Sequence, residues 1–288
     1  MTGNTLGWVI VAFVLYLLMM IAIGALYAKG NNNSEDYFLG GRKLNGFVAA
    51  LSAQASDMSG WLLMGLSGAI YLTGVGGDGW IAIGLFIGTT LNWLLIATKL
   101  RRYTIRANNS VTLPTYFENR FHDEKKVLMT VSSITIVVFF LVYCASALSA
   151  GGQLFESVFG IDYHVALTIG ALVVLVYTFL GGYMAVSWSN LLQGALMFVA
   201  LLLVPLYAIF HMGGFGVLAQ NLASLDPEFF NFLHGTTDPV QIVVLVSGGL
   251  GIGFMYPGMV HALTGLIAIK DPQEIKDAGL IATIWGCA

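Results

Sequence analysis

Apolar stretches long enough to cross a lipid bilayer follow one another along almost the whole chain of 288 residues. A membrane-spanning helix needs about 20 mostly apolar residues. Charged residues make up only 9% of the chain, and its mean hydropathy is +0.82. This pattern excludes a water-soluble domain and predicts an all-α, polytopic membrane helix bundle. We expect seven spans, at residues 8–28, 47–71, 80–98, 127–154, 165–186, 191–210 and 242–269.

An eighth apolar stretch covers residues 278–288, which is about half of one crossing. We therefore expect the sequence to be the N-terminal part of a longer protein, with its C-terminal part missing. Residues 1–288 are interpreted as a single transmembrane domain, because no connecting segment is long enough to form a second one. No basic residue precedes the first span, which favours a retained helix over a cleaved signal peptide.

The twelve Lys and Arg residues predict the orientation of these spans. With the seven spans above, all twelve fall in connecting segments on one side of the membrane. The segments on the other side carry acidic residues only. The positive-inside rule then makes the Lys/Arg-rich loops cytoplasmic and the N-terminus external. The predicted location is the cell inner (plasma) membrane, as a multi-pass protein in the lipid bilayer.

Several classes of function are excluded by composition. The net charge of −3 comes without a basic tract, so we expect no nucleic-acid partner. The two cysteines, Cys144 and Cys287, both lie in apolar spans, which excludes a disulfide framework or a metal cluster. Residues 74–79 match G-x-G-x-x-G, but no strand precedes them, so we expect a tight turn. No nucleophile–base pair is recognisable, and the chain is not expected to be an enzyme.

One acidic residue, Asp57, lies deep inside a predicted span, whereas the other fourteen lie in polar segments or at span ends. A charge at the bilayer centre costs about 2.5–3.5 kcal/mol on insertion scales, so such a residue is a functional-site hypothesis. Its small and hydroxylated neighbours favour a break in the helix. Carbonyl groups freed there can coordinate Na⁺, and freed N–H groups can meet a substrate carboxylate. A coupled proton instead of Na⁺, and a neutral structural carboxyl group, remain open.

A second break is predicted in residues 247–257, which contain four glycines and Pro257 within one span. Kinking without a break is the alternative. In the fourth span, Tyr143 either contacts substrate or bonds to a nearby carbonyl group. His261 follows Pro257 by one turn and is expected to be a packing residue.

These motifs together resemble the sodium/solute symporter family, and most closely its proline-transporting branch. The form Asp57-Met-Ser-Gly-Trp61 is the part most similar to that branch. The matching segments are Asp36-Tyr-Phe-Leu-Gly-Gly-Arg42, Ala55-Ser-Asp-Met-Ser-Gly-Trp-Leu-Leu-Met-Gly65, Leu113-Pro-Thr-Tyr-Phe117, Tyr143-Cys-Ala-Ser146, Phe155-Glu-Ser157, Gly181-Gly-Tyr-Met-Ala-Val-Ser-Trp188 and Gln193.

The resemblance implies a leading helix followed by two inverted five-helix repeats, of which the second is truncated here. It implies Na⁺ as the coupling ion, with backbone oxygens of Ala55 and Met58 among its ligands. The sodium residues are expected to be Ala55, Asp57, Met58 and Ser59. The substrate-binding residues are expected to be Ser56, Gly60, Trp61, Tyr143, Gly251, Tyr256 and Pro257.

Three features depart from the family pattern. Residues 248–257 lack the tryptophan of proline symporters and have a different spacing, which leaves the substrate open. Asn190 stands where the family carries an Asp. The Ser and Thr hydroxyls that close the family's sodium site come from a later helix that these residues do not include.

The sequence thus predicts a sodium-coupled symporter that imports proline or a related small amino acid or organic solute by alternating access. These residues alone are expected to show no coupled transport. The alternatives are a transporter-like membrane sensor module of a signalling protein and a nonfunctional truncated symporter. The oligomeric state is left open.

Overall fold

The computed structural model describes residues 3–233 and 235–287, without the side chains of residues 3–6 and 63. The regular secondary structure of that part is helical, apart from one isolated β-bridge between Leu44 and Ile269, and loops join the helices. Its α-helices are α1 (Gly3–Ala28), α2 (Ser34–Leu39), α3 (Gly46–Asp57), α4 (Ser67–Leu91), α5 (Thr98–Arg106), α6 (Leu113–Phe121), α7 (Val127–Phe159), α8 (Tyr163–His211), α9 (Phe215–Leu225), α10 (Pro239–Phe254), α11 (Val260–Ile267) and α12 (Glu274–Cys287). Four short turns, of 3₁₀ or π type, are η1 (Gly40–Arg42), η2 (Trp61–Leu66), η3 (Asn92–Ala97) and η4 (Tyr256–Gly258).

Five helical stretches of the described residues are long and apolar enough to cross a membrane. The all-α membrane fold expected from the sequence is thereby confirmed. The stretches are Gly7–Ala28, Met64–Arg106, Val127–Phe159, Tyr163–His211 and Pro239–Gly258. The last predicted stretch, 278–288, forms the main part of α12, and Ala288 lies outside the described residues.

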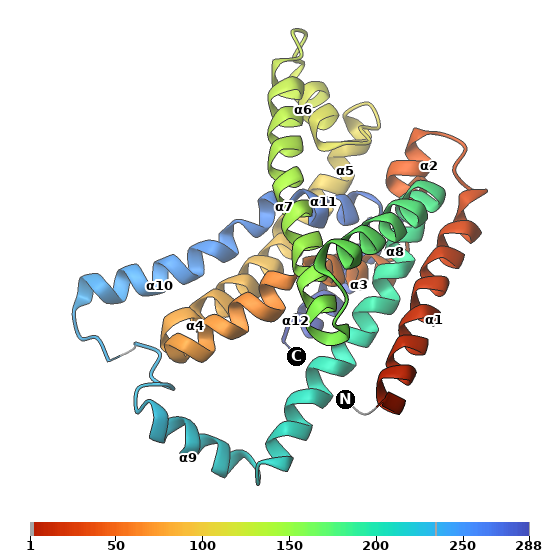
Figure 1. Ribbon diagram of the computed structural model, residues 1–288. Coiled ribbons are helices and arrows are strands. Elements are labelled where there is room, and N and C mark those ends of the chain that lie inside the picture. The colour runs from red at the N-terminus through yellow and green to blue at the C-terminus, as the bar shows by residue number, and fades with distance from the viewer. Residues whose placement is uncertain (1–2, 234, 288) are drawn as a thin grey trace.

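The helix α8 contains two of the predicted spans, because the chain reverses at Gly182. This residue has φ 57° and ψ −156°, a backbone conformation that L side chains rarely adopt. On one side of it Leu180 accepts a hydrogen bond from Asn31 at 3.3 Å, and further along Gln193 contacts Tyr16 of α1. The second arm therefore runs back along α1, and both arms are visible in Figure 1. The reversal takes one residue only, and it falls inside the predicted span 165–186, so the boundary between the fifth and sixth spans was predicted a few residues too late.

A similar reversal occurs at Gly74 within α4, where φ is 74° and ψ is 176°. It joins the end of the second predicted span to the third. The sequence prediction of a tight turn over residues 74–79 was partly wrong, because helix resumes at Val75. The Val75 N–H donates to the Phe229 carbonyl at 2.8 Å, which fixes the turn to the segment that follows α9.

Both predicted helix breaks are present. The helix α3 ends at Asp57, Met58 is non-helical with ψ 85°, and helix resumes at Gly60. The helix α10 ends at Phe254, and Met259, with ψ 106°, separates η4 from α11. This second break follows the four glycines and does not fall among them.

The glycines of α10 instead allow its backbone to touch that of α4. A side chain on Gly253 would meet the Gly84 carbonyl, and one on Gly88 would meet the Gly253 carbonyl. Gly249 likewise packs on Trp80. In lipid, where packing drives helix association, such small residues permit close approach.

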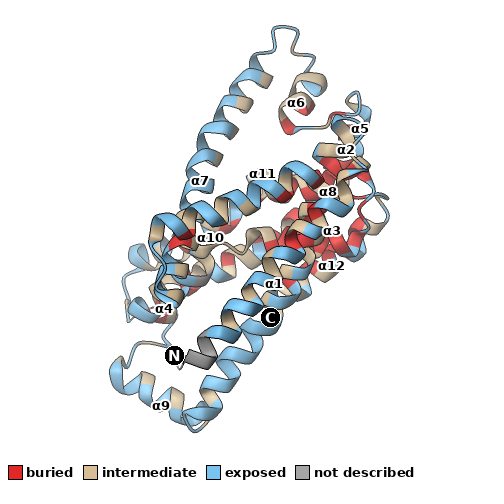
Figure 2. Cartoon of the chain, turned by 45° about the vertical axis from the view of Figure 1, so that its right-hand side comes forward, coloured by how far each residue is buried: buried red, intermediate tan, exposed pale blue. Residues whose placement is uncertain are grey.

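Buried side chains gather at one end of the molecule, where α3, α5, α11 and α12 meet (Figure 2). The helices α1, α7, α9 and α10 are largely exposed along their apolar surfaces. The most apolar part of Val127–Phe159 has no buried residue. These exposed apolar surfaces suit contact with lipid or with further helices.

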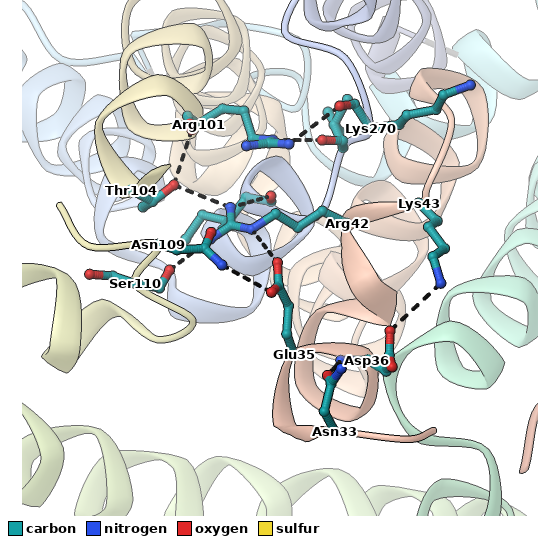
Figure 3. Close-up of polar contacts among 12 residues, drawn as sticks. Asn33, Glu35, Asp36, Arg42, Lys43, Arg101, Thr104, Asn109, Ser110 and Lys270 are labelled. Atoms are coloured by element: carbon teal, nitrogen blue, oxygen red, sulfur yellow. Dashed lines mark hydrogen bonds and ion pairs between the residues drawn. The ribbon is translucent and has the colours of Figure 1, made fainter. Parts of the chain in front are cut away.

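Two arginines at this end hold the C-terminal end of α11 (Figure 3). Arg42 donates to the carbonyl groups of Ile267 at 3.2 Å and Ser110 at 2.9 Å, and pairs with Glu35 at 3.0 Å. Arg101 donates to the Ile269 carbonyl at 2.6 Å. Burial lowers the pKa of Arg42, and the hydrogen bond to Glu35 counteracts this shift. The carbonyl group of Ile267, the last residue of α11, and that of Ile269 just after it thus gain partners outside the helix.

Candidate functional site

The two helix breaks lie next to each other and bring Asp57 and His261 together. The His261 Nε2 atom lies 3.6 Å from Asp57 Oδ1, and the side chains are 20% and 23% exposed. Both ring nitrogens of His261 are buried without a hydrogen-bond partner in the described part of the chain. An acidic and a basic group, 204 positions apart in sequence by their residue numbers, therefore meet where both helices are interrupted.

A cavity of about 340 Å³ opens beside this pair. Its wall is mostly apolar, and among the described residues that line it Asp57 is the only acidic one and none is Lys or Arg. Its lining residues are Asp57, Ser59, Gly60, Trp61, Leu62, Leu85, Tyr143, Ser146, Ala147, Ala150, Ile252, Met255, Met259 and His261. Asp57 and Met58 also border a second cavity of about 170 Å³, which Gln54 and Thr89 line. The carboxylate thus lies between two cavities.

The backbone at the first break offers groups without their usual helical partners. In a continuous helix the Ser59 N–H would donate to the Ala55 carbonyl group. It donates instead to the Asp57 carbonyl at 2.9 Å. The Ala55 carbonyl has therefore lost its helical donor. Helix resumes at Gly60, so its positive N-terminal end begins at the cavity wall.

An aromatic wall completes the site. The Tyr143 ring is nearly parallel to the His261 imidazole, with ring centroids 5.8 Å apart and an interplanar angle of 13°. Phe140 meets the same imidazole edge-on at 6.0 Å. His261 does pack, as the sequence predicted, and it also faces Asp57. An ionisable residue inside a broken membrane helix was the signal for this second role.

The groups at the first break suit a hard cation such as Na⁺. They include the Asp57 carboxylate, the Ser59 hydroxyl and the Ala55 carbonyl without its helical donor, which are all oxygen ligands. Helix carbonyl groups freed by unwinding coordinate Na⁺ in transporters with broken helices. Among the described residues no cluster of three His, Cys, Asp or Glu side chains exists. The donor set therefore fits Na⁺ better than a transition metal, which prefers nitrogen and sulfur ligands.

Three of the predicted substrate residues, Gly60, Trp61 and Tyr143, line the larger cavity. Ser56 does not, since its hydroxyl group donates back to the Ser52 and Ala53 carbonyls at 2.8 and 3.0 Å.

The other predicted substrate residues lie outside the larger cavity. Gly251 is exposed on α10, with open space where a side chain would be. Tyr256 is 1% exposed, and its hydroxyl group donates to Gln54 Oε1 at 3.3 Å. Pro257 borders a different cavity, with Leu113 and Phe117. Gly251 and Pro257 thus lie apart from the cavity beside Asp57, whereas Tyr256 contacts Gln54, which lines the second cavity together with Asp57.

Some lining residues were not predicted from the sequence. Ser146 lies three positions after Tyr143, so its place on the same helix face could have been found from the helical period. Met255 and Met259 flank the second break. Leu85 reaches the site only because the chain reverses at Gly74, and no local pattern indicates this.

Asn190, which stands where the family pattern has an Asp, ties two helices together. Its Nδ2 atom donates to Ser52 Oγ at 3.3 Å, which connects the second arm of α8 to α3. Gly194, one turn further along, packs on Ala55. The helix that carries Asp57 is therefore supported from this side by neutral groups.

The sequence profile of the Sodium:solute symporter family matches residues 37–287. The chain belongs to this family. Sodium:solute symporters are transporters, so the chain is not an enzyme, and with its apolar helices it is a multi-pass membrane protein. The family couples transport to Na⁺. The family resemblance seen in the sequence is confirmed.

The known proteins to which the chain is similar include proline transporters. The chain is 47% identical over 266 residues to the high-affinity proline transporter PutP of Bacillus subtilis (strain 168), which covers 92% of this chain and 55% of that protein. It is 44% identical over 276 residues to the sodium/proline symporter of Escherichia coli (strain K12), with 96% and 54% covered. The chain therefore spans about half the length of these relatives.

The fold has a counterpart among solved structures. A Na⁺-coupled sialic acid symporter, in a substrate-bound outward-open state, matches with a TM-score of 0.77 at 19% sequence identity. The match covers 94% of this chain and 55% of the symporter chain. It confirms the helical transporter fold.

Proposed function

We propose that this chain forms the ion-binding half of a sodium-coupled symporter that imports proline or a related small amino acid by alternating access. The observation that carries the proposal is the meeting of two broken helices at Asp57 and His261 beside a cavity. Similarity to sodium/proline symporters supports the choice of ion and solute.

Sodium is carried as cargo at the first break. Ala55 and Met58 supply backbone oxygens, while Asp57 supplies the negative charge that offsets the cation. Ser59 lies at the cavity wall and can add a hydroxyl oxygen. An ion bound here would replace the helical donor that the Ala55 carbonyl has lost and would lower the cost of a carboxylate in the membrane.

The substrate occupies the larger cavity. A zwitterionic amino acid would place its carboxylate at the N-terminal end of the helix that resumes at Gly60, where the helix dipole favours negative charge. Its apolar ring would pack between Trp61, Tyr143 and the methionines of the second break. Ser56, Gly251, Tyr256 and Pro257 would support this pocket from outside the cavity described above.

Coupling follows if Na⁺ binds one conformation better than the other. Bound Na⁺ joins the two halves of the broken second span, so it would favour the conformation in which the pocket is formed. We place the N-terminus outside the cell membrane and the basic loops in the cytoplasm, as the distribution of Lys and Arg predicts.

The test is uptake of labelled proline, measured over a range of sodium concentrations, by cells that express the complete protein. In the variant Asp57→Asn we expect the half-saturating sodium concentration to rise at least about 10-fold. The asparagine side chain keeps an oxygen ligand but loses the negative charge that offsets the cation. The variant Asp78→Asn is the matched control. Asp78 bonds to Thr73 at 3.0 Å near the Gly74 turn, outside both cavities.

An unchanged sodium dependence in Asp57→Asn would contradict the assigned role of this carboxylate. Uptake that follows a proton gradient and ignores sodium would contradict sodium coupling. Sodium-driven uptake of other amino acids, but not of proline, would support the symporter assignment and contradict proline as the substrate.

A further inference from the structure

One face of α5 is basic and turned away from the protein core. Lys99, Arg102, Tyr103 and Arg106 recur at intervals of three and four residues, which places them on one side of a helix. All four residues are exposed. The opposite side of α5 is buried and consists of Leu100, Arg101 and Thr104.

Arg120 of α6 extends this basic face. Its guanidinium group lies 4.5 Å from the centroid of the Tyr103 ring. It also lies 5.8 Å from the ring of Tyr116 and 5.9 Å from that of Phe121. Arg106 approaches the Tyr103 ring at 6.0 Å, so two guanidinium groups gather around one half-exposed aromatic ring. We call Lys99, Arg102, Tyr103, Arg106 and Arg120 the basic aromatic cluster.

The positive charges of this cluster are not balanced by protein groups. In the described part of the chain, none of its Lys or Arg side chains forms an ion pair with a carboxylate. The nearby Glu118 pairs with Lys126 at 3.5 Å. Residues 98–126 hold seven Lys or Arg and three Asp or Glu. Like charges held this close repel, so the cluster favours an anion between them.

The cluster lies where an apolar helix surface gives way to a charged one. Leu94 and Leu95, about one turn before Lys99, are 71% and 56% exposed. Phe121, beside Arg120, is 61% exposed. Exposed leucines followed by arginines and aromatic rings are typical of the boundary between the hydrocarbon core and the headgroups. In Figures 1 and 2, α5 and α6 lie at the same end of the molecule.

We propose that the basic aromatic cluster binds the phosphate group of an anionic phospholipid. Arginine recognises phosphate through paired N–H donors, and the guanidinium groups around Tyr103 leave such donors free. Basic residues next to membrane helices attract the acidic lipids of the cytoplasmic leaflet. The cluster shares no residue with the cavity beside Asp57, so this proposal does not depend on the transport function.

The experiment is native mass spectrometry of the purified chain titrated with phosphatidylglycerol, with phosphatidylcholine as the neutral lipid. In the double variant Arg106→Gln/Arg120→Gln we expect phosphatidylglycerol affinity to fall about 30-fold, because the two guanidinium groups that would contact its phosphate lose their charge. The matched control is Lys29→Gln/Lys276→Gln. It removes two exposed charges from the same predicted side, outside the cluster, and should change affinity less than about twofold.

A third variant keeps the test decisive if the glutamine variant does not fold. Arg106→Lys/Arg120→Lys retains both charges, so we expect an affinity loss of only about 3- to 10-fold. The proposal is overturned if phosphatidylcholine binds as tightly as phosphatidylglycerol, or if both double glutamine variants lose affinity equally. It is also overturned if inorganic phosphate at the same concentration displaces the lipid, since the site would then select the free anion.

Discussion

A carboxylate inside a membrane needs surroundings that accommodate its charge, and Asp57 has several such contacts. Its backbone carbonyl accepts from Ser59, its side chain faces His261 at 3.6 Å, and it borders two cavities. The same break that removes the helical donor of the Ala55 carbonyl brings the carboxylate to the cavity wall. The cost of burying the charge and the capacity to bind a cation therefore have one structural cause.

Tyr143 offers a test at this scale, because its ring and its hydroxyl group make separable contributions. The ring stacks on His261 and lines the cavity. We expect Tyr143→Phe, which retains the ring, to raise the KM for proline less than about threefold. We expect Tyr143→Ala to raise it at least about 10-fold, since the lost aromatic contact contributes about 0.5–1.5 kcal/mol beyond its buried area. Uptake kinetics on cells distinguish the two results, and equal KM values for both variants would reject a role for the ring.

At the scale of helices, the contact between α4 and α10 shows how glycine acts as a packing residue. Gly84, Gly88 and Gly253 let the two backbones touch without side chains between them. This contact holds the outer part of the second broken span against α4. The break at Met255–Met259 therefore begins at a fixed position, directly after the glycines.

Alanine at this contact tests its importance. We expect Gly253→Ala to lower the free energy of unfolding by about 1–3 kcal/mol, because its methyl group would meet the Gly84 carbonyl. The matched control is Gly248→Ala on the same helix, where a methyl group meets open space. That change should be neutral or stabilising by up to about 1 kcal/mol, because alanine favours helix. Thermal unfolding in detergent compares them, and equal stabilities would contradict the proposed packing.

The elements that the sequence predicted correctly are those with local signals. Apolar length located the spans, and the small residues around Asp57 and the proline at 257 located the breaks. The reversals at Gly74 and Gly182 could not be placed to the residue, since several glycines stand nearby and only the packing decides which one takes positive φ. Contacts between distant residues, such as Asp57 with His261 or Gly84 with Gly253, depend on how spans assemble. No local pattern encodes them.

For the molecule as a whole, packing and charge are distributed unevenly along its length. The buried core and the arginines Arg42 and Arg101 lie at the same end, which we propose to be cytoplasmic from the distribution of Lys and Arg. An alternating-access transporter that faces outward must be closed at its cytoplasmic end. If the chain works as proposed, the hydrogen bonds from these arginines to Ile267 and Ile269 are contacts that opening would have to break.

Labelling of single cysteines tests this orientation. In a background with Cys144→Ser and Cys287→Ser, we expect Ser224→Cys in α9 to react with a membrane-impermeant maleimide on intact cells. We expect Lys29→Cys and Gln273→Cys to react only after the membrane is permeabilised. All three positions are exposed. The reverse pattern would invert the proposed topology, and labelling of all three on intact cells would refute the span count.

The direct backbone contact between α4 and α10 also limits which substitutions this protein can accept during evolution. A larger residue at position 84 or 253 has no neighbouring side chain that could shrink to make room, because the neighbour is main chain. In ordinary protein cores a second substitution can restore the packing that a first one disturbs. At these two positions no such second substitution is available. We expect substitutions to accumulate on the faces of both helices that point away from this contact, while positions 84 and 253 stay glycine. Sequencing survivors from a randomised library would reveal that contrast.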